Sequence, residues 1–570
     1  MIFMLFCDLF SSIYAVSRVI KDTWFTGRSE DALAQAEFAQ KAVEDAVEVA
    51  LCKTNDMRNG EMKQFTVEGA SVLLVKDNGE FSAIGAKCPH YGASLAAGYY
   101  SKGKVRCPLH GACFSTATGD IEDYPGLDSV PKYATKIVDD EVYLVASREL
   151  LVNKRVKKMA QRTECSARAP VVIVGGGPSA QVCAETMRQE GYRGRIVMIS
   201  ADRYPPYDRV QLTKRNQAKP EDIQLRNEEF YEQNDIELRL ETVVRSVNTE
   251  EKFVEIEGSC EIIGYSKLVI AVGGAARKLE IPGKELQGVH YVRNLDDNTA
   301  LDASGKRVVV IGGSFVGLES AALLAKAAES VVVVCNDLVP LRRTMGEIAG
   351  KAVLKLFDSR GVKIETNASV AALVGENGAV TEVVLSDGRR LKADFVVAGI
   401  GLIPQTAFLE GSGLQLDSRG FIPVNETMRT SVKDVFAIGD VCTFPLRWFT
   451  NSDAPVNVQH YQVAQKHGQT AGAVIAGVPR KISTVPFFWT VLFGKGFRFS
   501  GYAQSLDDCI VRGDEEGFNV YIFKDNRLVA VSSMGANAQS VRFIDVFARG
   551  IRVTREEVKM NHTDDWSHLN

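Results

Sequence analysis

Two short segments of the chain each hold one cysteine and one histidine at a spacing that suits metal binding. Cys88 and His90 form the first pair, Cys107 and His110 form the second, and residues 91–106 lie between them. In a Rieske-type [2Fe–2S] cluster, two thiolates bind one iron and two imidazoles bind the other. We therefore expect Cys88 and Cys107 on one iron, and His90 and His110 on the second.

The main alternative to an iron–sulfur cluster is a structural zinc site, because tetrahedral zinc also accepts two cysteines and two histidines. Zinc motifs usually place like ligands together in one loop, whereas each loop here mixes a cysteine with a histidine. The mixed loops favour the cluster. A third interpretation is that the two pairs are buried side chains that bind no metal.

The composition is that of a globular protein and sets limits on its partners. The 570 residues are 45% hydrophobic and 24% charged, with a formal net charge of −4. This length predicts three or four domains, and the near-neutral balance gives no footprint for nucleic acid. The cysteines are scattered, which excludes a disulfide framework. We expect an intracellular protein of the cytoplasm or the mitochondrion.

The first twenty residues are apolar but are interrupted by Asp8, Ser11, Ser12 and Arg18. They are too broken for a confident membrane span and lack the charged start of a signal peptide. Two interpretations stay open, namely a weak membrane anchor or targeting segment, and a packed or disordered extension. The Ala/Glu-rich residues 29–49 then predict a helix.

From residue 47 to about residue 146 the pattern changes to short β-rich runs separated by turn residues. Residues 72–75 and 142–145 are apolar runs, and Asp77-Asn78-Gly79 is a typical hairpin turn. We predict a small β-domain that carries the two ligand loops. The basic residues 148–168 then form an interdomain linker, or alternatively a segment that docks on an acidic surface or membrane.

A glycine-rich turn follows the buried-strand pattern of residues 171–174. The strand, turn, helix and second strand at residues 196–199 appear in the order of a dinucleotide-binding fold, in which the turn receives a pyrophosphate. An acid after the second strand binds the adenosine ribose. The expected contacts are Gly175, Gly177, Pro178, Ser179, Ala180 and Asp202.

The same pattern recurs after residues 308–311, with a helix expected through residues 321–328 and a strand over 331–334. Two such folds in one chain predict two cofactors, FAD at the first and NAD(P)H at the second. A glycine turn that serves packing alone is the alternative for the second fold. The expected contacts there are Gly312, Ser314, Gly317 and Glu319.

Two further strands end in glycine turns that are typical of flavoproteins. Residues 268–272 lead into Gly273, at a point where the chain crosses between two such folds. Residues 435–438 lead into Gly439 and Asp440, and the Asp440 carboxylate is suited to accept hydrogen bonds from the ribityl chain of a flavin. We include Gly273, Gly439 and Asp440 among the cofactor-binding residues.

Together these motifs resemble the apoptosis-inducing factor and ferredoxin-reductase type flavoproteins. With the cysteine–histidine loops in front, the chain is similar to the apoptosis-inducing factor 3-like family over roughly residues 47–560. The segments that make the resemblance specific are residues 88–93, 107–114, 206–209, 212–214, 439–440 and 483–490.

The resemblance implies roles for individual residues. Arg209 and Lys214 would lie along the flavin, with Lys214 near its N5 edge, and Asp440 would hold the ribityl chain. Trp489 would lie near the dimethylbenzene side, although an aromatic core anchor is the alternative for this residue. Lys214 and Trp489 are therefore the expected catalytic residues.

The resemblance also implies a multidomain fold, in which a small all-β Rieske domain precedes an α/β flavoprotein with two Rossmann-like dinucleotide-binding domains and a C-terminal α/β domain. The FAD domain would be split by the NAD domain. The expected boundaries are 1–46 (extension and helix), 47–146 (Rieske), 147–168 (linker), 169–299 and 426–482 (FAD), 300–425 (NAD(P)) and 483–570 (C-terminal domain and tail).

Two departures from the family pattern matter. An acid often ends the second strand of an NAD fold, but Cys335 stands there, followed by Asn336 and Asp337, and Arg342-Arg343 could serve a 2′-phosphate. The choice between NADH and NADPH therefore stays open. Disulfide reductases of this fold carry a Cys-x₄-Cys pair after the first turn, whereas only Cys183 occurs here, so thiol–disulfide chemistry is not expected.

The ligand loops also predict a low reduction potential. High-potential Rieske proteins add a cysteine to each loop and hydroxyl donors to the cluster sulfurs. The matching positions here are Ala93, Leu109, Ala112 and Phe114. Fewer donors stabilise the reduced cluster less, which predicts a potential of roughly −150 mV, the low end of the Rieske range.

The sequence thus predicts an NAD(P)H oxidoreductase in which electrons pass from NAD(P)H through FAD to the Rieske cluster and then to an unidentified acceptor, for which a protein is one candidate. The alternative is a cell-death or signalling protein whose redox domains act as a conformational switch. A Rieske oxygenase is disfavoured, because the remaining histidines form no convincing facial triad. The chain would be a monomer or homodimer, with any membrane association through residues 1–20.

Overall fold

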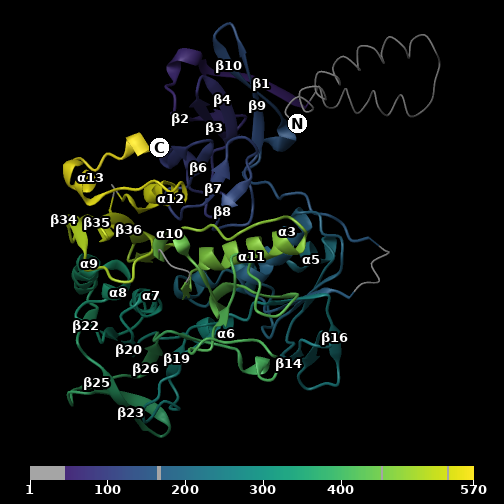
Figure 1. Ribbon diagram of the computed structural model, residues 1–570. Helices are drawn as coiled ribbons and strands as arrows, with labels where there is room; N and C mark the ends of the chain where they lie inside the picture. The colour runs from purple at the N-terminus through teal and green to yellow at the C-terminus, as the bar shows by residue number, and fades with distance from the viewer. Residues whose placement is uncertain (1–44, 164–168, 451–453, 536–537, 570) are drawn as a thin grey trace. The chain divides into compact units, whose positions relative to one another are not determined.

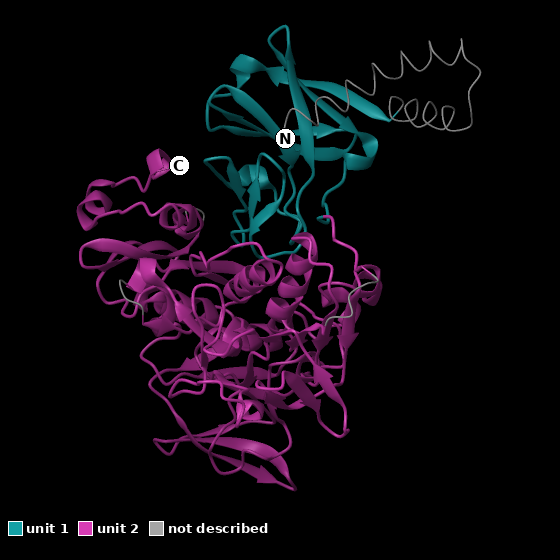
Figure 2. Cartoon of the chain, turned by 45° about the vertical axis from the view of Figure 1, so that its right-hand side comes forward, with its two compact units in different colours: residues 1–157 teal, residues 158–570 magenta. Residues whose placement is uncertain are grey.

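The computed structural model describes residues 45–163, 169–450, 454–535 and 538–569, so the expected anchor over residues 1–20 lies outside the described residues. The chain divides into two compact units, Met1–Lys157 and Lys158–Asn570 (Figure 2). Among the described residues, none of the helices is long and apolar enough to cross a membrane.

Unit 1 is built on a six-stranded antiparallel sheet of order β1-β10-β9-β4-β3-β2. Its strands are β1 (Ala46–Lys53), β2 (Met62–Val67), β3 (Ala70–Asp77), β4 (Glu80–Gly85), β9 (Lys132–Val138) and β10 (Glu141–Ser147). The Asp77-Asn78-Gly79 turn is confirmed, because it joins β3 to β4 with both Asn78 and Gly79 at positive φ.

The helix expected over residues 29–49 is wrong at its end, and residues 29–44 lie outside the described residues. Residues 46–49 belong to β1, in which Val47 is buried and its two neighbours are exposed, and they pair with β10. Alternating burial and pairing with a neighbouring strand outweigh the local preference of alanine and glutamate for helix.

A second, four-stranded antiparallel sheet of unit 1 lies between β4 and β9 in the chain. It contains β5 (Tyr99–Ser101), β6 (Lys104–Arg106), β7 (Cys113–Ser115) and β8 (Ile121–Asp123) in sequence order. The first cysteine–histidine segment connects β4 to β5, and the second connects β6 to β7. The small sheet therefore holds both ligand loops at strand ends.

Unit 2 contains two parallel sheets, each followed at its glycine turn by a helix (Figure 1). The first has the order β13-β12-β11-β17-β29, with β11 (Val171–Val174), β12 (Ile196–Ile199), β13 (Ile236–Arg239), β17 (Lys267–Ile270) and β29 (Val435–Ala437). Helices α3 (Pro178–Gln189) and α11 (Tyr461–Ile475) lie side by side against each other. Gly468 permits this contact, because a Cβ there would lie 2.3 Å from the Ser179 carbonyl oxygen.

The second parallel sheet has the order β19-β26-β20-β21-β22. Its strands are β19 (Val289–Tyr291), β20 (Arg307–Ile311), β21 (Ser330–Val334), β22 (Lys363–Glu365) and β26 (Phe395–Ala398), with helices α7 (Phe315–Leu324) and α9 (Glu347–Asp358). The helix expected through residues 321–328 begins and ends earlier. Strand β29 belongs to the first sheet but follows the last strand of the second sheet in the sequence. The second fold is therefore inserted between β17 and β29 of the first.

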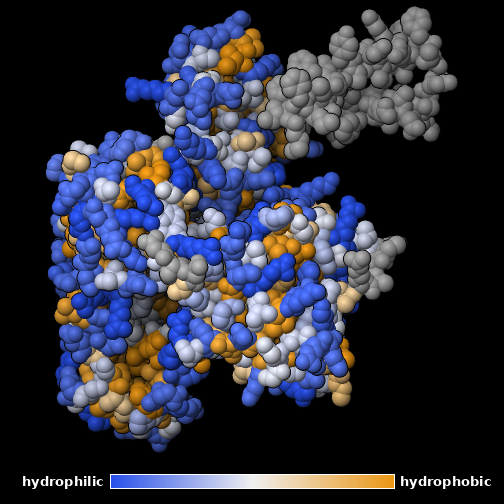
Figure 3. Space-filling model, in the orientation of Figure 1, coloured by the Kyte–Doolittle hydropathy of each residue, from blue (hydrophilic) through white to orange (hydrophobic). Residues whose placement is uncertain are grey.

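The last part of unit 2 is an antiparallel sheet of order β32-β33-β36-β35-β34 with two helices. The elements are β32 (Phe487–Leu492), β33 (Lys495–Gly501), β34 (Cys509–Asp514), β35 (Gly517–Lys524), β36 (Arg527–Met534), α12 (Ser540–Ala548) and α13 (Arg555–Met560). The face in Figure 3 is mainly hydrophilic with small hydrophobic patches, because most apolar side chains lie inside the sheets.

Smaller elements connect these sheets. The short strands are β14 (Val244–Asn248), β15 (Phe253–Ile256), β16 (Ile262–Gly264), β18 (Gly274–Ala276), β23 (Val370–Glu376), β24 (Ala379–Leu385), β25 (Arg390–Lys392), β27 (Leu402–Pro404), β28 (Ile422–Pro423), β30 (Cys442–Pro445) and β31 (Pro455–Val456). The short helices are α4 (Pro220–Ile223), α5 (Glu228–Gln233), α6 (Leu295–Thr299), α8 (Arg342–Met345) and α10 (Arg447–Thr450).

Candidate iron–sulfur and flavin sites

The two ligand loops of unit 1 share one backbone conformation. The Cys88 amide donates to the Ala93 carbonyl at 2.8 Å, and the Gly92 amide donates back to the Cys88 carbonyl at 2.9 Å. The second loop repeats the first of these bonds between Cys107 and Ala112, also at 2.8 Å. The two loops thus share this backbone hydrogen bonding, although His90 is the second residue after its cysteine and His110 is the third.

The four predicted ligands pair in space by chemical type. The Nδ1 atoms of His90 and His110 lie 3.2 Å apart. Two nitrogens bound to one tetrahedral metal through bonds of about 2.1 Å lie about 3.4 Å apart. The Cys107 sulfur is hydrogen-bonded to Cys88 and, together with burial, raises the pKa of the Cys88 thiol. One pair of imidazoles and one pair of thiols are the ligand types that the two irons of a [2Fe–2S] cluster need.

The two histidine ligands lie near the surface of unit 1, and we call this place the histidine edge. His110 is 9% exposed, whereas Tyr91 and Leu109 beside it are 46% and 38% exposed. The ring of Tyr91 stacks on that of His90, with centroids 3.7 Å apart. The buried guanidinium of Arg106 donates to the Gly111 carbonyl at 2.7 Å and so holds the second loop.

The first glycine turn of unit 2 is shaped to receive a pyrophosphate. Gly175 has φ of +125°, and a Cβ there would lie 2.3 Å from the Ala271 carbonyl oxygen, so only glycine fits. Gly177 is the N-cap of α3 and Pro178 its first residue, which leaves the amides of the first turn available to an anion. Ala180 is fully buried below the turn.

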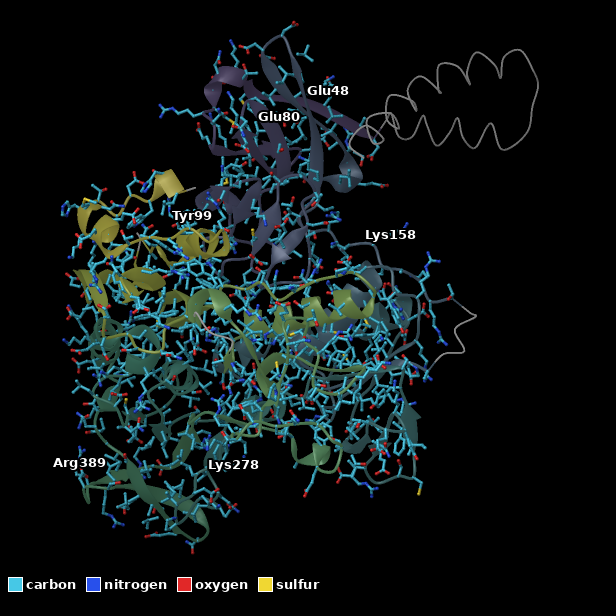
Figure 4. The ribbon with its side chains drawn as sticks, in the orientation of Figure 1. Glu48, Glu80, Tyr99, Lys158, Lys278 and Arg389 are labelled. Carbon is cyan, nitrogen blue, oxygen red and sulfur yellow. The ribbon has the colours of Figure 1, made fainter. Side chains whose placement is uncertain are left out.

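Two cavities adjoin at this turn and share Gly176, Arg209, Val272, Ala276 and Arg293. The larger, about 1150 Å³, is lined by Gly175, Asp202 and Lys278, which is labelled in Figure 4. The smaller, about 410 Å³, is lined by the remaining residues of interest, namely Gly177, Pro178, Ser179, Gly273, Ser314, Glu319, Asp440 and Trp489. The two adjoining cavities offer the room that a dinucleotide such as FAD needs.

The acids of these cavities differ in their partners. Asp202 accepts a hydrogen bond from the Tyr207 hydroxyl at 2.8 Å and lies 3.5 Å from the Arg209 guanidinium. Asp440 lies 3.9 Å from Arg293, and burial raises its pKa despite the two nearby arginines. Each carboxylate is suited to a flavin hydroxyl, which would complete its hydrogen bonding.

Lys214 and Glu319 form the most connected polar group of this region. Lys214 Nζ lies 2.7 Å from Glu319 Oε1, which also accepts from the Thr490 hydroxyl at 2.6 Å. The Thr213 hydroxyl donates to the other oxygen, Oε2. Glu319 comes from α7 of the second fold and Thr490 from β32, so this carboxylate joins three parts of unit 2.

The second glycine turn repeats the backbone of the first. Gly312 also has φ of +125°, and a Cβ there would lie 2.3 Å from the Gly399 carbonyl oxygen. Gly317 packs against this turn, where a Cβ would lie 2.0 Å from the Gly312 carbonyl oxygen. Gly439, in the first fold, likewise packs closely on Ser179, so these three glycines shape the turns rather than line the cavities.

Several cavity residues were missed in the sequence. Arg293 follows β19 and lines both cavities, and His460, at the N-terminus of α11, lines the smaller one. Burial lowers the pKa of His460 to about 4, and its ring meets Phe488 with centroids 4.5 Å apart. A lone histidine or arginine carries no motif, and only its position after a sheet strand or before a helix could have drawn attention to it.

His467 and Cys183 serve packing. His467 is fully buried, and its Nδ1 accepts from the Gly439 amide at 3.2 Å, so it holds the turn before Asp440. Cys183 is fully buried in α3, and burial raises the pKa of its thiol to about 12. A buried thiol with a high pKa is a poor nucleophile, in agreement with the sequence prediction.

Comparisons with known proteins follow this division of the chain. Residues 47–134 match the Rieske [2Fe-2S] domain, residues 169–468 the pyridine nucleotide-disulphide oxidoreductases and residues 487–564 the reductase C-terminal domain. The structure of a covalent putidaredoxin reductase–putidaredoxin complex has a TM-score of 0.65 and 28% identity, covering 68% of this chain and 95% of that chain.

Fold and site together define a ferredoxin-reductase-like NAD(P)H oxidoreductase that contains FAD and a Rieske [2Fe–2S] cluster. The chain belongs to the pyridine nucleotide-disulphide oxidoreductase family and is 43% identical to human "Apoptosis-inducing factor 3", over 92% of this chain and 89% of that protein. It is 33% identical to a Sphingomonas ferredoxin–NAD(P)(+) reductase, over 65% and 91%. The predicted fold class, cofactors and family resemblance are confirmed, and the zinc alternative is set aside.

Proposed function

We propose that this chain moves electrons from NAD(P)H through FAD to the Rieske cluster of the same polypeptide, and from there to a protein acceptor. The observation that carries the proposal is the smaller cavity, which is lined by Gly177 and Ser179 of the first fold and by Ser314 and Phe315 of the second. A nicotinamide and a flavin ring that meet in one cavity are placed for hydride transfer.

FAD, when bound, accepts a hydride and releases electrons singly, which nicotinamides do not readily do. Gly175, Gly177, Pro178 and Ser179 would hold its pyrophosphate, and Ala180 would pack beneath them. Asp202 would bind the ribose and Asp440, with Gly273 and Gly439 shaping the adjacent turns, the ribityl chain. The NAD(P)H pyrophosphate would lie at the turn that Gly312 and Gly317 shape, with Ser314 facing it.

The catalytic group of this proposal is the ion pair of Lys214 and Glu319. Its three donors keep the Glu319 carboxylate in place, and Glu319 lines the smaller cavity, whereas Lys214 reaches it only through this ion pair. Lys214 would present its ammonium near the flavin N5 edge, with Arg209 along the ring. Trp489 lines the cavity and would cover the dimethylbenzene side.

Four ligands would hold the cluster, Cys88 and Cys107 at one iron and His90 and His110 at the other. We propose the domain boundaries 47–146 for the Rieske domain, 169–299 and 426–482 for the FAD domain, 300–425 for the NAD(P) domain and 483–570 for the C-terminal domain. A parallel sheet that is completed only by β29 supports the split FAD domain.

The acceptor is inferred to be a protein. Related chains carry the names ferredoxin– and rubredoxin–NAD(+) reductase, and the matched solved structure holds a reductase bound to putidaredoxin. The exposed rings and side chains at the histidine edge, Tyr91 and Leu109, suit contact with a protein surface. The nine described cysteines form no disulfide with one another, which fits a compartment such as the cytoplasm or the mitochondrion.

The test is anaerobic addition of NADH or NADPH to the purified full chain. We expect the flavin absorbance to bleach and a reduced Rieske EPR signal to appear. The Cys107→Ser variant, which removes an iron ligand, should bleach normally without the EPR signal. A flavin that bleaches in the wild-type protein while its cluster stays oxidised would contradict the relay.

A second candidate function follows from the name of the human and mouse relatives, "Apoptosis-inducing factor 3". In that case the redox domains would act as a conformational switch in cell death. The two functions separate in cells that express the His110→Ala variant, which removes a cluster ligand. A cell-death effect that survives in this variant supports signalling independent of electron transfer.

A further inference from the structure

One fully buried amide side chain of unit 2 lies outside both glycine turns. Asn298 belongs to the short helix α6, which lies between β19 and β20 in the chain of the second parallel sheet, and it is 0% exposed. Burial of an amide is costly unless its N–H groups and its oxygen find partners. The partners of Asn298 therefore show which part of the molecule this side chain holds.

All three partners of Asn298 belong to one loop of the first fold. Its Nδ2 donates to the Leu212 carbonyl at 2.7 Å and to the Arg215 carbonyl at 2.8 Å, and its Oδ1 accepts from the Ala218 amide at 2.7 Å. Both N–H groups and the oxygen are thus used on the chain between residues 212 and 218. One side chain closes this loop from the inside.

The loop that Asn298 closes lines the smaller cavity and carries the lysine of the ion pair. It continues from the 3₁₀ turn η4 (Arg209–Thr213), whose last two residues line that cavity. Lys214 comes directly next, with its Nζ 2.7 Å from Glu319 Oε1. The two carbonyls that Asn298 holds lie on either side of Lys214 in the chain.

The start of η4 is held by the same segment of the chain. The Tyr207 hydroxyl accepts from the amide of Leu295, the first residue of α6, at 3.1 Å. The Arg209 guanidinium donates to the Arg293 carbonyl at 2.7 Å. Residues 293–298 are therefore bonded to the first fold both before and after η4, and Asn298 makes the bonds nearest to Lys214.

We propose that Asn298 is a positioning residue for flavin reduction, because it fixes the backbone from which Lys214 reaches Glu319 and the flavin N5 edge. A lysine side chain is long and flexible, so the carboxylate restrains only its end and the backbone must be held separately. A shift of about 1 Å at a reacting group can cost about a hundredfold in rate. The inference rests on the proposed function, in which Lys214 acts beside the flavin.

The test measures flavin reduction in the full chain by anaerobic stopped flow, over a range of NADH or NADPH concentrations. Asn298→Asp keeps the shape of the side chain and its acceptor oxygen but loses both N–H donors. We expect the limiting rate to fall about tenfold, while the nucleotide concentration that gives half of it changes less than about twofold. Asn298→Ala should show the same pattern.

The matched control is Thr299→Ala, on the same helix. The Thr299 side chain is exposed, and its hydroxyl donates to the Asp296 carbonyl of α6. This variant should reduce its flavin at the wild-type rate. All variants are compared per bound FAD, which removes differences in cofactor content.

A double-mutant cycle with Lys214→Met separates positioning from general support of the fold. In the Lys214→Met background, Asn298→Asp should slow reduction less than about twofold, because the group that Asn298 positions is gone. A tenfold loss in that background, a normal rate in the single variant, or loss of bound FAD from either Asn298 variant would overturn the inference. The wild-type flavin would still bleach in these cases, so the proposed function would stand, whereas a wild-type flavin that neither nucleotide bleaches would contradict the proposed function itself.

Discussion

The two glycine turns of unit 2 share their backbone and differ in the side chains that surround it. Gly175 and Gly312 both have φ of +125°, and at each a Cβ would lie 2.3 Å from a carbonyl oxygen of the neighbouring strand's end. The backbone that receives a pyrophosphate is therefore built twice in the same way.

Both folds carry an acid three residues after the second strand, and the partners of the two acids differ. Asp202 accepts a hydrogen bond from the Tyr207 hydroxyl and lines a cavity, whereas Asp337 pairs with Arg342 and Arg343. The helices differ too, because α7 carries the buried acid Glu319, and α3 carries the apolar Val182 at the matching position. Backbone geometry thus prepares a dinucleotide site, and side chains decide which dinucleotide it takes.

The largest expected effect comes from adding one methyl group to either glycine turn, because the two variants should lose different functions. Gly175→Ala should prevent FAD binding, because its Cβ would overlap the Ala271 carbonyl and the residue would be strained at positive φ. Gly312→Ala should keep the flavin but lose its reduction by NAD(P)H. Bound FAD is measured by absorbance after gel filtration, and bleaching by stopped flow.

Circular dichroism of both variants checks that the unit is folded. A Gly312→Ala variant that lost FAD while Gly175→Ala retained it would reverse the assignment of the two folds. Equal loss of FAD in both would mean that the turns are not independent sites.

A smaller effect is expected when Glu319 loses one of its hydrogen bonds. Thr490→Val removes the hydroxyl that donates to Glu319 at 2.6 Å but keeps the shape of the side chain. A hydrogen bond to a charged group contributes about 1.5–3 kcal/mol, so hydride transfer should slow about ten- to a hundredfold with FAD content unchanged. Thr490→Ser should restore the rate, and a normal rate in Thr490→Val would show that this bond is not needed.

The dependence of stability on pH should show the contribution of His467, the buried histidine of α11. Burial is the main cause that lowers the pKa of His467, to about 3, so the folded protein binds no proton there while the unfolded chain binds one below about pH 6.5. The free energy of unfolding is then highest above pH 6.5 and falls as the pH drops, by up to about 1.4 kcal/mol per pH unit.

His467→Gln keeps an acceptor for the Gly439 amide but cannot bind a proton. Its thermal midpoint of FAD release should change less between pH 7.5 and pH 5 than that of the wild-type protein. Parallel curves for the two proteins would mean that His467 contributes nothing to the acid sensitivity.

The smallest expected change lies outside both turns. Phe114 is buried beside the ligand loops at a position where a hydroxyl would meet the cluster sulfurs in high-potential relatives. Phe114→Tyr should raise the potential from roughly −150 mV by about 40 mV, the equivalent of one hydrogen bond of about 1 kcal/mol for one electron. Phe65→Tyr, on β2, is the control. Protein-film voltammetry measures the reduction potential of each variant.

Much of this architecture could be predicted because it depends on local patterns. Apolar runs before Gly175 and Gly312 predicted both turns, since a parallel strand must be buried and a tight turn needs glycine. The metal ligands of the two loops could be predicted because a cysteine and a histidine at such short spacing are rare without a function. The mixture of cysteine and histidine in each loop favoured iron over zinc, and the match to the Rieske domain agrees with it.

What the sequence did not predict depends on contacts between distant segments. Thr490 meets Glu319 only when β32 packs on α7, and Arg293 enters the cavities only because β19 joins the second sheet. The helix predicted over residues 29–49 also ran too far, into a strand whose partner β10 lies about a hundred residues later in the chain.

The central claim is that one polypeptide carries electrons from NAD(P)H to its own Rieske cluster. Rapid mixing with NADH or NADPH followed by freeze-quench EPR, at protein concentrations that differ tenfold, tests it most directly. We predict that the flavin bleaches first and that the cluster is then reduced at a rate independent of protein concentration. A cluster that is reduced in proportion to protein concentration would show transfer between molecules and contradict the account.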